Sequence, residues 1–258
     1  MSMPGSPSGQ SSLISISTKN ISKRFSKSGE VSSVLQDISF DVETGKILAI
    51  VGKSGIGKTT LLNIVSGLEQ ADLGSVESRG SIGYMPQKDL LLPWRTTIAN
   101  VLLPIEIQKG DLWAATLRAR QFFQKHGLSH FENAYPSEIS GGMRQKISLM
   151  RVFLQDPDTI LFDEPFSAID ADARLQLVKD VRLYITSSRK SAIFVTHNIE
   201  EAIAVSDKLI VLGEQPATII YQTDIVIPDE YRDPVSVRKS DGFQDLFERI
   251  WELIGKQI

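Results

Sequence analysis

The chain carries two kinds of apolar pattern, and each kind predicts a different sort of strand. Apolar and polar residues alternate over 14–16 and again over 38–42, which predicts half-exposed strands, the first of them at a sheet edge. Elsewhere the apolar residues form nearly continuous runs, at 47–51, 159–162, 192–195 and 209–212. Such runs are typical of central parallel strands that are covered on both faces, so we expect them to form the core of a sheet.

Segments with helical periodicity separate these runs, which predicts a doubly wound α/β core. The stretch from about 88 to 157 differs, because it contains three helical patterns and no strand: 96–108, 111–126 and 141–155. We therefore expect a helical subdomain inserted into the sheet domain. The pattern at 170–189 predicts a helix that packs on the sheet, and 243–254 predicts a helix near the end of the chain.

The domain prediction is a single domain over 13–258, with a helical subdomain at about 88–157 and a C-terminal extension at about 213–258. Residues 1–12 are mainly Ser, Gly and Pro, which predicts a disordered tail.

Composition excludes several classes of protein. The net charge of −3 gives no basic footprint for nucleic acid, and the absence of cysteine excludes a disulfide scaffold and cysteine metal sites. No apolar run approaches the roughly 20 residues that span a bilayer, and the start of the chain lacks the pattern of a secretory signal. Any role at a membrane therefore needs a partner.

The first chemical motif is Gly52-Lys53-Ser54-Gly55-Ile56-Gly57-Lys58-Thr59, which matches the phosphate-binding pattern G-x-x-x-x-G-K-[ST] at every fixed position. A buried strand is predicted before it, and a helix that includes Thr60 after it. This order wraps backbone N–H groups around a polyphosphate. Lys58 would neutralise the β- and γ-phosphates, and the Thr59 hydroxyl would bind Mg²⁺.

The second motif is a pair of carboxylates, Asp163 and Glu164, directly after the apolar run 159–162. An isolated acidic pair after a strand is more often a cap or a solvated turn. Beside a phosphate loop, Asp163 can hold Mg²⁺ and Glu164 can polarise a water for attack on the γ-phosphate.

The third motif, Ser140-Gly141-Gly142, precedes a predicted helix. Part of its role is an ordinary helix cap, but a hydroxyl and glycine N–H groups at a helix N-terminus also bind phosphate well. Because the chain already has one phosphate loop, this second surface is best explained by a γ-phosphate held on another copy.

Taken together, these motifs resemble the nucleotide-binding subunits of ABC transporters, over about residues 13–212. Glu164 then corresponds to the catalytic glutamate, and Ile139 and Met143 are departures from the usual Leu and Gln. The resemblance adds Gln87 as the Q-loop residue, Asp170 in the D-loop and His197 as the switch histidine. It also places Phe25 where an aromatic ring stacks on adenine.

The resemblance implies ATP and Mg²⁺ as ligands. We expect Glu164, His197 and Lys58 to be catalytic, and Thr59, Gln87 and Asp163 to bind the metal. The expected nucleotide-binding residues are Phe25, Gly52, Lys53, Ser54, Gly55, Ile56, Gly57, Lys58, Thr59, Thr60, Gln87, Ser140, Gly141, Gly142 and Asp170. The implied fold is a P-loop ABC ATPase with a mainly parallel sheet core, an antiparallel β subdomain and the inserted helical subdomain.

The segment 89–96 resembles the nitrate/sulfonate/taurine branch of ABC importers. This implies a head-to-tail dimer on the cytoplasmic side of the inner membrane, attached to transmembrane permease subunits and served by a solute-binding protein. Trp94 would then lie in a socket for the permease, unless it is a core residue. The alternatives are a soluble ABC-type ATPase that acts on nucleic acid or ribosomes, and a P-loop kinase. The kinase alternative leaves Ser140, Gln87 and His197 unexplained.

Overall fold

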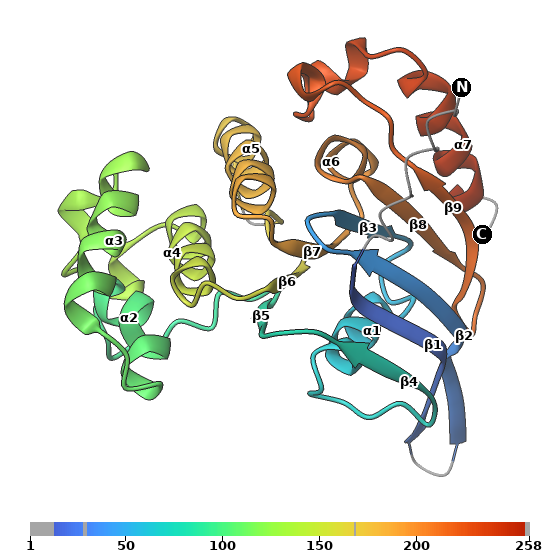
Figure 1. Cartoon of the computed structure of the whole chain (residues 1–258), viewed down its shortest axis with the longest axis horizontal. Coiled ribbons are helices and arrows are strands. Elements are labelled where there is room, and N and C mark those ends of the chain that lie inside the picture. Colours follow the sequence, from blue (N-terminus) through green and yellow to red (C-terminus); the bar gives the residue numbers. More distant parts are fainter. Residues whose placement is uncertain (1–12, 28–29, 168, 256–258) are drawn as a thin grey trace, which may run out of the picture.

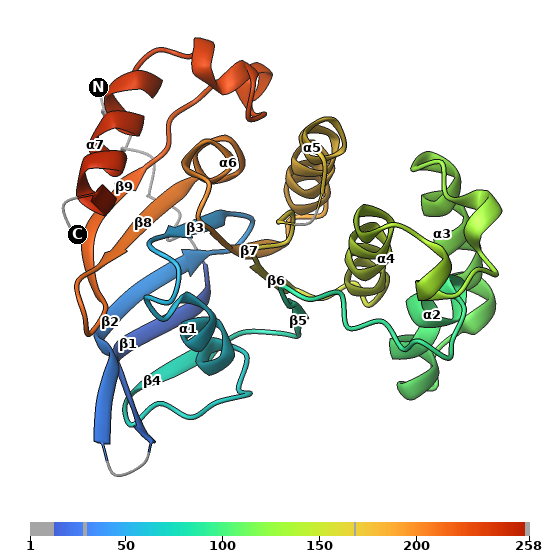
Figure 2. The same cartoon turned by 180° about the vertical axis from the view of Figure 1, so that it is seen from behind.

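The computed structural model describes residues 13–27, 30–167 and 169–255, and the predicted tail at 1–12 lies outside this range. Its described strands form one six-stranded and one three-stranded sheet. In Figures 1 and 2 the two sheets lie together on one side of the molecule, with most of the helical subdomain on the other.

The six-stranded sheet has the order β5-β6-β7-β3-β8-β9. The first five strands are parallel, and β9 runs antiparallel to β8. The strand bounds are β3 Ile47–Val51, β5 Ile82–Met85, β6 Thr159–Asp163, β7 Ser191–Thr196, β8 Lys208–Gly213 and β9 Thr218–Asp224. The strands that precede Asp163 and His197 are neighbours, since Asp163 is in register with Val195.

The continuous apolar runs are explained by burial on both faces of this sheet. In β3, Leu48 and Ile50 pack in one cluster with residues of α1 (Lys58–Val65), whereas Ala49 and Val51 pack in another with α6 (Ile199–Val205) and α7 (Phe243–Gly255). The helix α5 (Ala171–Ser187) packs on β6 and β7 through a third cluster. Every residue of β3, β6 and β7 is buried.

The three-stranded antiparallel sheet has the order β2-β1-β4 and corrects one prediction. Its strands are β1 Ile14–Lys27, β2 Glu30–Glu43 and β4 Leu73–Ser78. The strand that begins at Ile14 lies in the centre and not at an edge, because β4 pairs with its second side. Alternation shows that one face of a strand is buried, but it carries no information on how many neighbours the strand has.

Two main-chain hydrogen bonds join the two sheets. The N–H of Gln36 donates to the carbonyl of Ala217 at 2.9 Å, and the N–H of Ala217 donates to the carbonyl of Val34 at 2.9 Å. The second strand of the small sheet is therefore fixed to the turn between β8 and β9.

The helical subdomain consists of α2 (Thr97–Ile107), α3 (Leu112–Lys125) and α4 (Gly141–Leu154). The three helices share a separate core that includes Val101, Phe123 and Ile147. Short 3-10 turns cover Ser129–Phe131, Pro136–Glu138, Asp229–Tyr231 and Ser236–Lys239. Within the part of the chain that the structure describes, every helix is too short or too polar to cross a bilayer.

Candidate functional site

The glycine loop connects the carboxyl end of β3 to α1, and two of its glycines are required by their surroundings. A Cβ on Gly52 would lie 2.9 Å from the carbonyl oxygen of Leu212. Gly57 has a φ of +114°, and a Cβ there would lie 2.9 Å from the side chains of Val34 and Leu35. The loop thus follows a path that only glycine allows at these two positions.

Lys58 is the first residue of α1 and its side chain is buried. Its Nζ donates to the carbonyl oxygens of Gly52 and Lys53, each at 2.9 Å. Burial lowers the pKa of the amino group, and the carboxylates of Glu164 and Asp163 oppose that shift. A cation is therefore held inside the glycine loop at a helix N-terminus, where a polyphosphate binds well.

Thr59 and Asp163 meet although one strand separates their elements. The Thr59 hydroxyl donates to Asp163 Oδ2 at 2.8 Å, across the end of β7. Burial raises the pKa of Asp163, and the bond from Thr59 counteracts it. One hydroxyl and one carboxylate fit Mg²⁺, which keeps most of its ligands as water and phosphate oxygens.

Glu164 is the point where three predicted motifs converge. Its carboxylate lies 3.0 Å from His197 Nδ1, accepts a bond from Gln87 Nε2 at 3.3 Å, and lies 3.9 Å from Lys58 Nζ. Its side chain is only 15% exposed, so most of its surface faces these groups. The structure therefore brings the predicted base, the histidine, the glutamine and the loop lysine into one site.

Other predicted residues lie outside this cluster. Ser140 is exposed and caps α4, since its hydroxyl accepts from the N–H of Met143 at 3.2 Å; Gly141 and Gly142 form the first turn. Asp170 caps α5 by accepting from the N–H of Ala173 at 3.0 Å. Figure 1 shows α4 with the helical subdomain, apart from α1 and the glycine loop.

Ser54, Gly55 and Ile56 border an open cleft of about 690 Å³ together with Lys53. Thr60 lies in the first turn of α1. Phe25 is in β1 with 41% of its surface exposed, and Lys23 Nζ lies 5.2 Å from the centre of its ring. Stacking of Phe25 on adenine stays a prediction.

Sequence reasoning missed Tyr84, whose hydroxyl donates to Asn63 Oδ1 at 3.1 Å and lies 3.5 Å from Asp163 Oδ2. Burial raises the pKa of this hydroxyl, so it remains a donor. A tyrosine three residues before Gln87 was the available signal.

Comparison with known proteins identifies the family of this site. A family model described as ABC transporter matches residues 35–167. The chain belongs to the ABC transporter family. An ABC relative from Halalkalibacterium halodurans, the formylaminopyrimidine import ATP-binding protein ThiZ, is 39% identical over 78% of this chain and 81% of its own length. An aliphatic sulfonates import ATP-binding protein, SsuB 2 from Pseudomonas syringae pv. tomato, is 36% identical over 84% of this chain and 93% of its own length.

A solved ABC cassette confirms the fold. The dimeric post-hydrolysis structure of an ATP-binding cassette bound to ADP and Pi covers 82% of this chain and 99% of its own, with a TM-score of 0.75 at 24% identity. The predicted P-loop ABC fold is thus confirmed. Membership of the ABC transporter family, together with the ATP-binding import subunits among its relatives, shows that this protein is an ABC ATPase. Both of these relatives are import subunits by name, which supports an importer ATPase over one that acts on nucleic acid or ribosomes.

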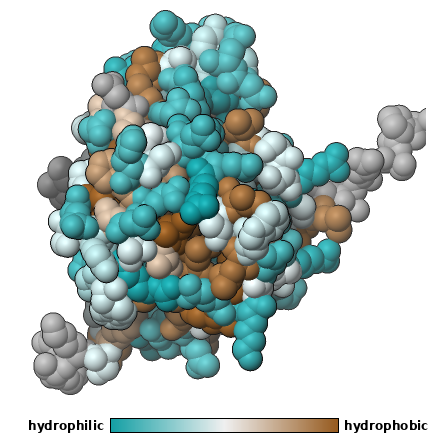
Figure 3. Space-filling view, turned by 90° about the vertical axis from the view of Figure 1, so that its left-hand side faces the viewer, coloured by the Kyte–Doolittle hydropathy of each residue, from teal (hydrophilic) through white to brown (hydrophobic). Residues whose placement is uncertain are grey.

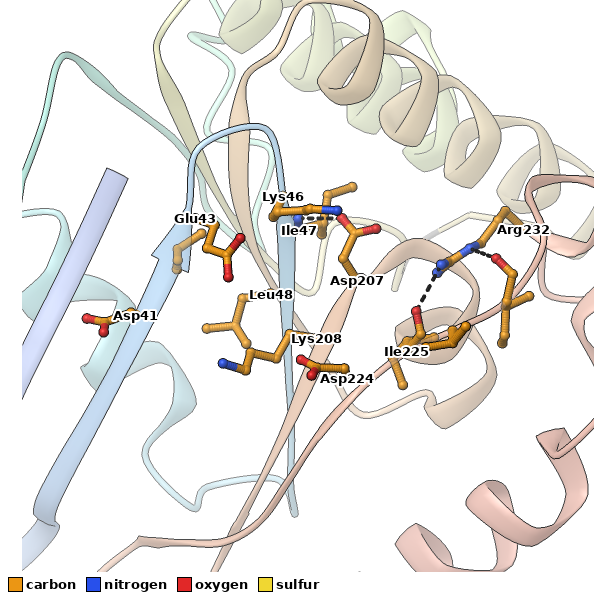
Figure 4. Close-up of a pocket in the computed structure, with 13 residues that line it drawn as sticks. Asp41, Glu43, Lys46, Ile47, Leu48, Asp207, Lys208, Asp224, Ile225 and Arg232 are labelled. Carbon is orange, nitrogen blue, oxygen red and sulfur yellow. Dashed lines mark hydrogen bonds between the residues drawn. The ribbon is translucent and has the colours of Figure 1, made fainter. Parts of the chain in front are cut away.

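A second cavity of this ABC ATPase, of about 410 Å³, lies at the end of the sheet strands opposite to the glycine loop (Figure 4). It opens beside the amino ends of β3 and β8, whereas the glycine loop follows the carboxyl end of β3. Two of its polar side chains hold the main chain. Asp207 accepts from the N–H of Ile47 at 2.9 Å, and Arg232 donates to the carbonyls of Ile225 and Ile227. These bonds are structural, and we assign this cavity no part in nucleotide binding.

Proposed function

We propose that the chain is the ATP-hydrolysing subunit of an importer for small anions or organic solutes, of the nitrate, sulfonate or taurine kind. It would act as a head-to-tail dimer on the cytoplasmic side of the inner membrane. The observation that carries this proposal is the convergence of Lys58, Gln87 and His197 on the Glu164 carboxylate.

The contacts support a proposed role for each residue of the cluster. Glu164 polarises the attacking water, and His197, 3.0 Å away, orients the carboxylate and contacts the γ-phosphate. Lys58 neutralises the β- and γ-phosphates of ATP from within the loop. Thr59, Asp163 and Gln87 would hold Mg²⁺, which would supply charge neutralisation at the phosphate oxygens.

The remaining residues complete the site from a second copy. Ser140, Gly141 and Gly142 lie at the exposed N-terminus of α4, apart from the glycine loop of the same chain. Asp170 is exposed at the N-terminus of α5. In a head-to-tail dimer the two identical sites are built or lost together. Each γ-phosphate would then meet Lys58 of one copy and Ser140 of the other.

The segment 90–95 is the proposed socket for a permease. Trp94 is 72% exposed and Leu90 is 59% exposed, so Trp94 does not belong to the core. Figure 3, which looks onto this end of the molecule, shows apolar surface gathered between polar side chains. The buried side chain of Asn100 holds the segment by bonds to the main chain of Leu92 and Arg95. A fixed loop with an exposed aromatic ring suits docking, because such residues often dominate an interface.

The class of solute rests on the relatives. Two import subunits with more than a third of their residues identical serve formylaminopyrimidine and aliphatic sulfonates by name. A solute-binding protein and the permease would select the solute, since the site described above binds nucleotide.

The test of this function uses Glu164→Gln. The amide cannot polarise water as a base, so we expect the ATPase rate to fall about 10²–10⁴-fold while ATP binding remains. With ATP this variant should form a stable dimer in size-exclusion chromatography with light scattering. Adding Ser140→Arg should abolish that dimer and spare ATP binding. A purified Glu164→Gln protein with a near-normal rate contradicts the assignment of the base.

A further inference from the structure

The turn that carries His197 is held by a hydrogen bond to a buried carboxylate, that of Glu201. Thr196, which precedes the histidine, donates its hydroxyl to Glu201 Oε2 at 3.1 Å. The same hydroxyl oxygen accepts from the N–H of Asn198, which follows the histidine, at 3.0 Å. Thr196 and Glu201 are 2% and 4% exposed. The Thr196 hydroxyl thus links the two residues that flank His197, and the buried Glu201 carboxylate accepts a hydrogen bond from that hydroxyl.

The other oxygen of Glu201 faces Arg174 on α5, with 3.5 Å between Oε1 and Arg174 Nη1. Arg174 Nη2 in turn donates to the carbonyl oxygen of Ile169 at 3.0 Å. Ile169 directly precedes Asp170, the residue that the proposed function places at the dimer interface. A continuous set of contacts therefore runs from the segment before Asp170 to the turn of His197.

The charges of this pair depend on each other. Burial raises the pKa of Glu201, and the Arg174 guanidinium and the Thr196 hydroxyl lower it. Without Arg174 the carboxylate would be a buried charge with a single neutral donor, which is strongly unfavourable. Arg174 therefore favours the ionised form of Glu201, which is the stronger acceptor for the Thr196 hydroxyl.

We propose that Thr196, Glu201 and Arg174 position His197 against Glu164 and tie it to the segment before Asp170. Glu201 is then a positioning residue, since it acts on hydrolysis only through the turn of His197. This inference rests on the proposed function of His197. It predicts that breaking the set lowers kcat and leaves the KM for ATP almost unchanged, because the glycine loop is not involved.

The first test compares Thr196→Val with Thr196→Ser in the full chain. Valine keeps the shape of the side chain and removes the hydroxyl, whereas serine keeps the hydroxyl. We expect the valine variant to lower kcat about 10–100-fold, as small displacements of reacting groups do, with a KM within about twofold of the original. The serine variant should recover most of the rate. Equal rates for the two variants, or a normal rate for valine, overturn the proposal.

The second test separates positioning from stability. Arg174→Met leaves Glu201 buried and unpaired, so the melting temperature should fall. Arg174→Met combined with Glu201→Met removes both charges together with the acceptor for the Thr196 hydroxyl, and should recover most of the melting temperature. The kcat should stay low in both. If kcat recovers together with the melting temperature, the pair is only structural and the proposal is wrong.

Lys179→Met is the matched control. Lys179 also lies on α5 and also pairs with a buried carboxylate, Asp233, at 3.1 Å. Among the described residues no contact joins Lys179 to Thr196, so the kcat of the Lys179→Met variant should be unchanged. A fall in kcat as large as that of Thr196→Val overturns the proposal. The Glu164→Gln assay is independent of these variants. A normal ATPase rate in Glu164→Gln refutes the proposed function. A low rate in Glu164→Gln combined with a normal rate in Thr196→Val refutes only this inference.

Discussion

Glu164 combines its chemical contacts with a strained main chain. Its φ of +46° lies in the left-handed region, which costs a non-glycine residue about 1–3 kcal/mol. The N–H of Glu164 donates to the carbonyl of Val195 at 2.9 Å, which holds this conformation beside the neighbouring strand. The strain turns the carboxylate toward His197 and Gln87, so backbone conformation and chemistry are coupled at this residue.

The buried Asp163 carboxylate lowers the stability of the folded protein, and its proposed role in holding Mg²⁺ explains why a carboxylate is kept there. Burial raises its pKa above the value in the unfolded chain, so the folded state binds this proton more tightly. The stabilisation that Asp163 contributes to the folded state is fully present below the pKa of this carboxyl in the unfolded chain. It is lost as the pH rises through the higher pKa of the folded protein. The ionised carboxylate therefore opposes folding at neutral pH.

We accordingly expect Asp163→Asn to raise the denaturation midpoint at pH 7 and to reduce Mg²⁺-dependent ATP hydrolysis. Chemical denaturation across a pH series checks this, and the difference in stability should narrow as pH falls toward about 4. An Asp163→Asn protein that is less stable at pH 7 would contradict the assigned cost of burial.

At the scale of elements, the helix caps separate structural from functional roles. Ser140 caps α4 with one hydrogen bond, and Asp111 caps α3 by accepting from the N–H groups of Trp113 and Ala114, each at 3.0 Å. Both helices belong to the same subdomain, so the two caps form a matched pair.

Ser140→Ala and Asp111→Ala should each lower the free energy of unfolding by about 1 kcal/mol, the usual value of an N-cap. Only Ser140→Ala should also weaken the ATP-dependent dimer of the Glu164→Gln protein, because only Ser140 would face the partner's γ-phosphate. Analytical ultracentrifugation with ATP measures this. Equal dimer affinities for the two variants would show that Ser140 is merely a cap.

The sequence was most informative where a pattern is local. The runs at 47–51 and 159–162 and the three helices of the subdomain lie within one or two residues of their predicted bounds. The strand β4 was missed because its residues are mostly exposed and show no alternation. The contacts of Tyr84 and Glu201 depend on which strands and helices are neighbours, and that order is set by the tertiary fold.

At the scale of the whole molecule, Trp94 and Trp113 test the proposed socket. Both are highly exposed, at 72% and 75%, but Trp113 lies on α3 and outside the segment 90–95. Trp94→Ala should weaken recovery of a polytopic permease with the tagged chain from solubilised membranes by about 30-fold, the effect of losing an interface hot spot.

Trp113→Ala controls for nonspecific adhesion and should leave recovery unchanged. The ATPase rate of the isolated subunit should be preserved in both variants. Unfolding or loss of hydrolysis in Trp94→Ala would place the socket elsewhere.

The pair of main-chain bonds at Ala217 has a mechanical consequence. They fix β2 to the larger sheet, and Gly57 brings the glycine loop against Val34 and Leu35 of the same strand. These contacts tie the glycine loop, the small sheet and the larger sheet to one another. The chain crosses between the sheet and the helical subdomain at 86–96 and 155–158, and Leu149 and Val152 of α4 also pack in one cluster with residues of β5 and β6. A displacement at the nucleotide would therefore reach the helical subdomain through these crossings and through the packed face of α4.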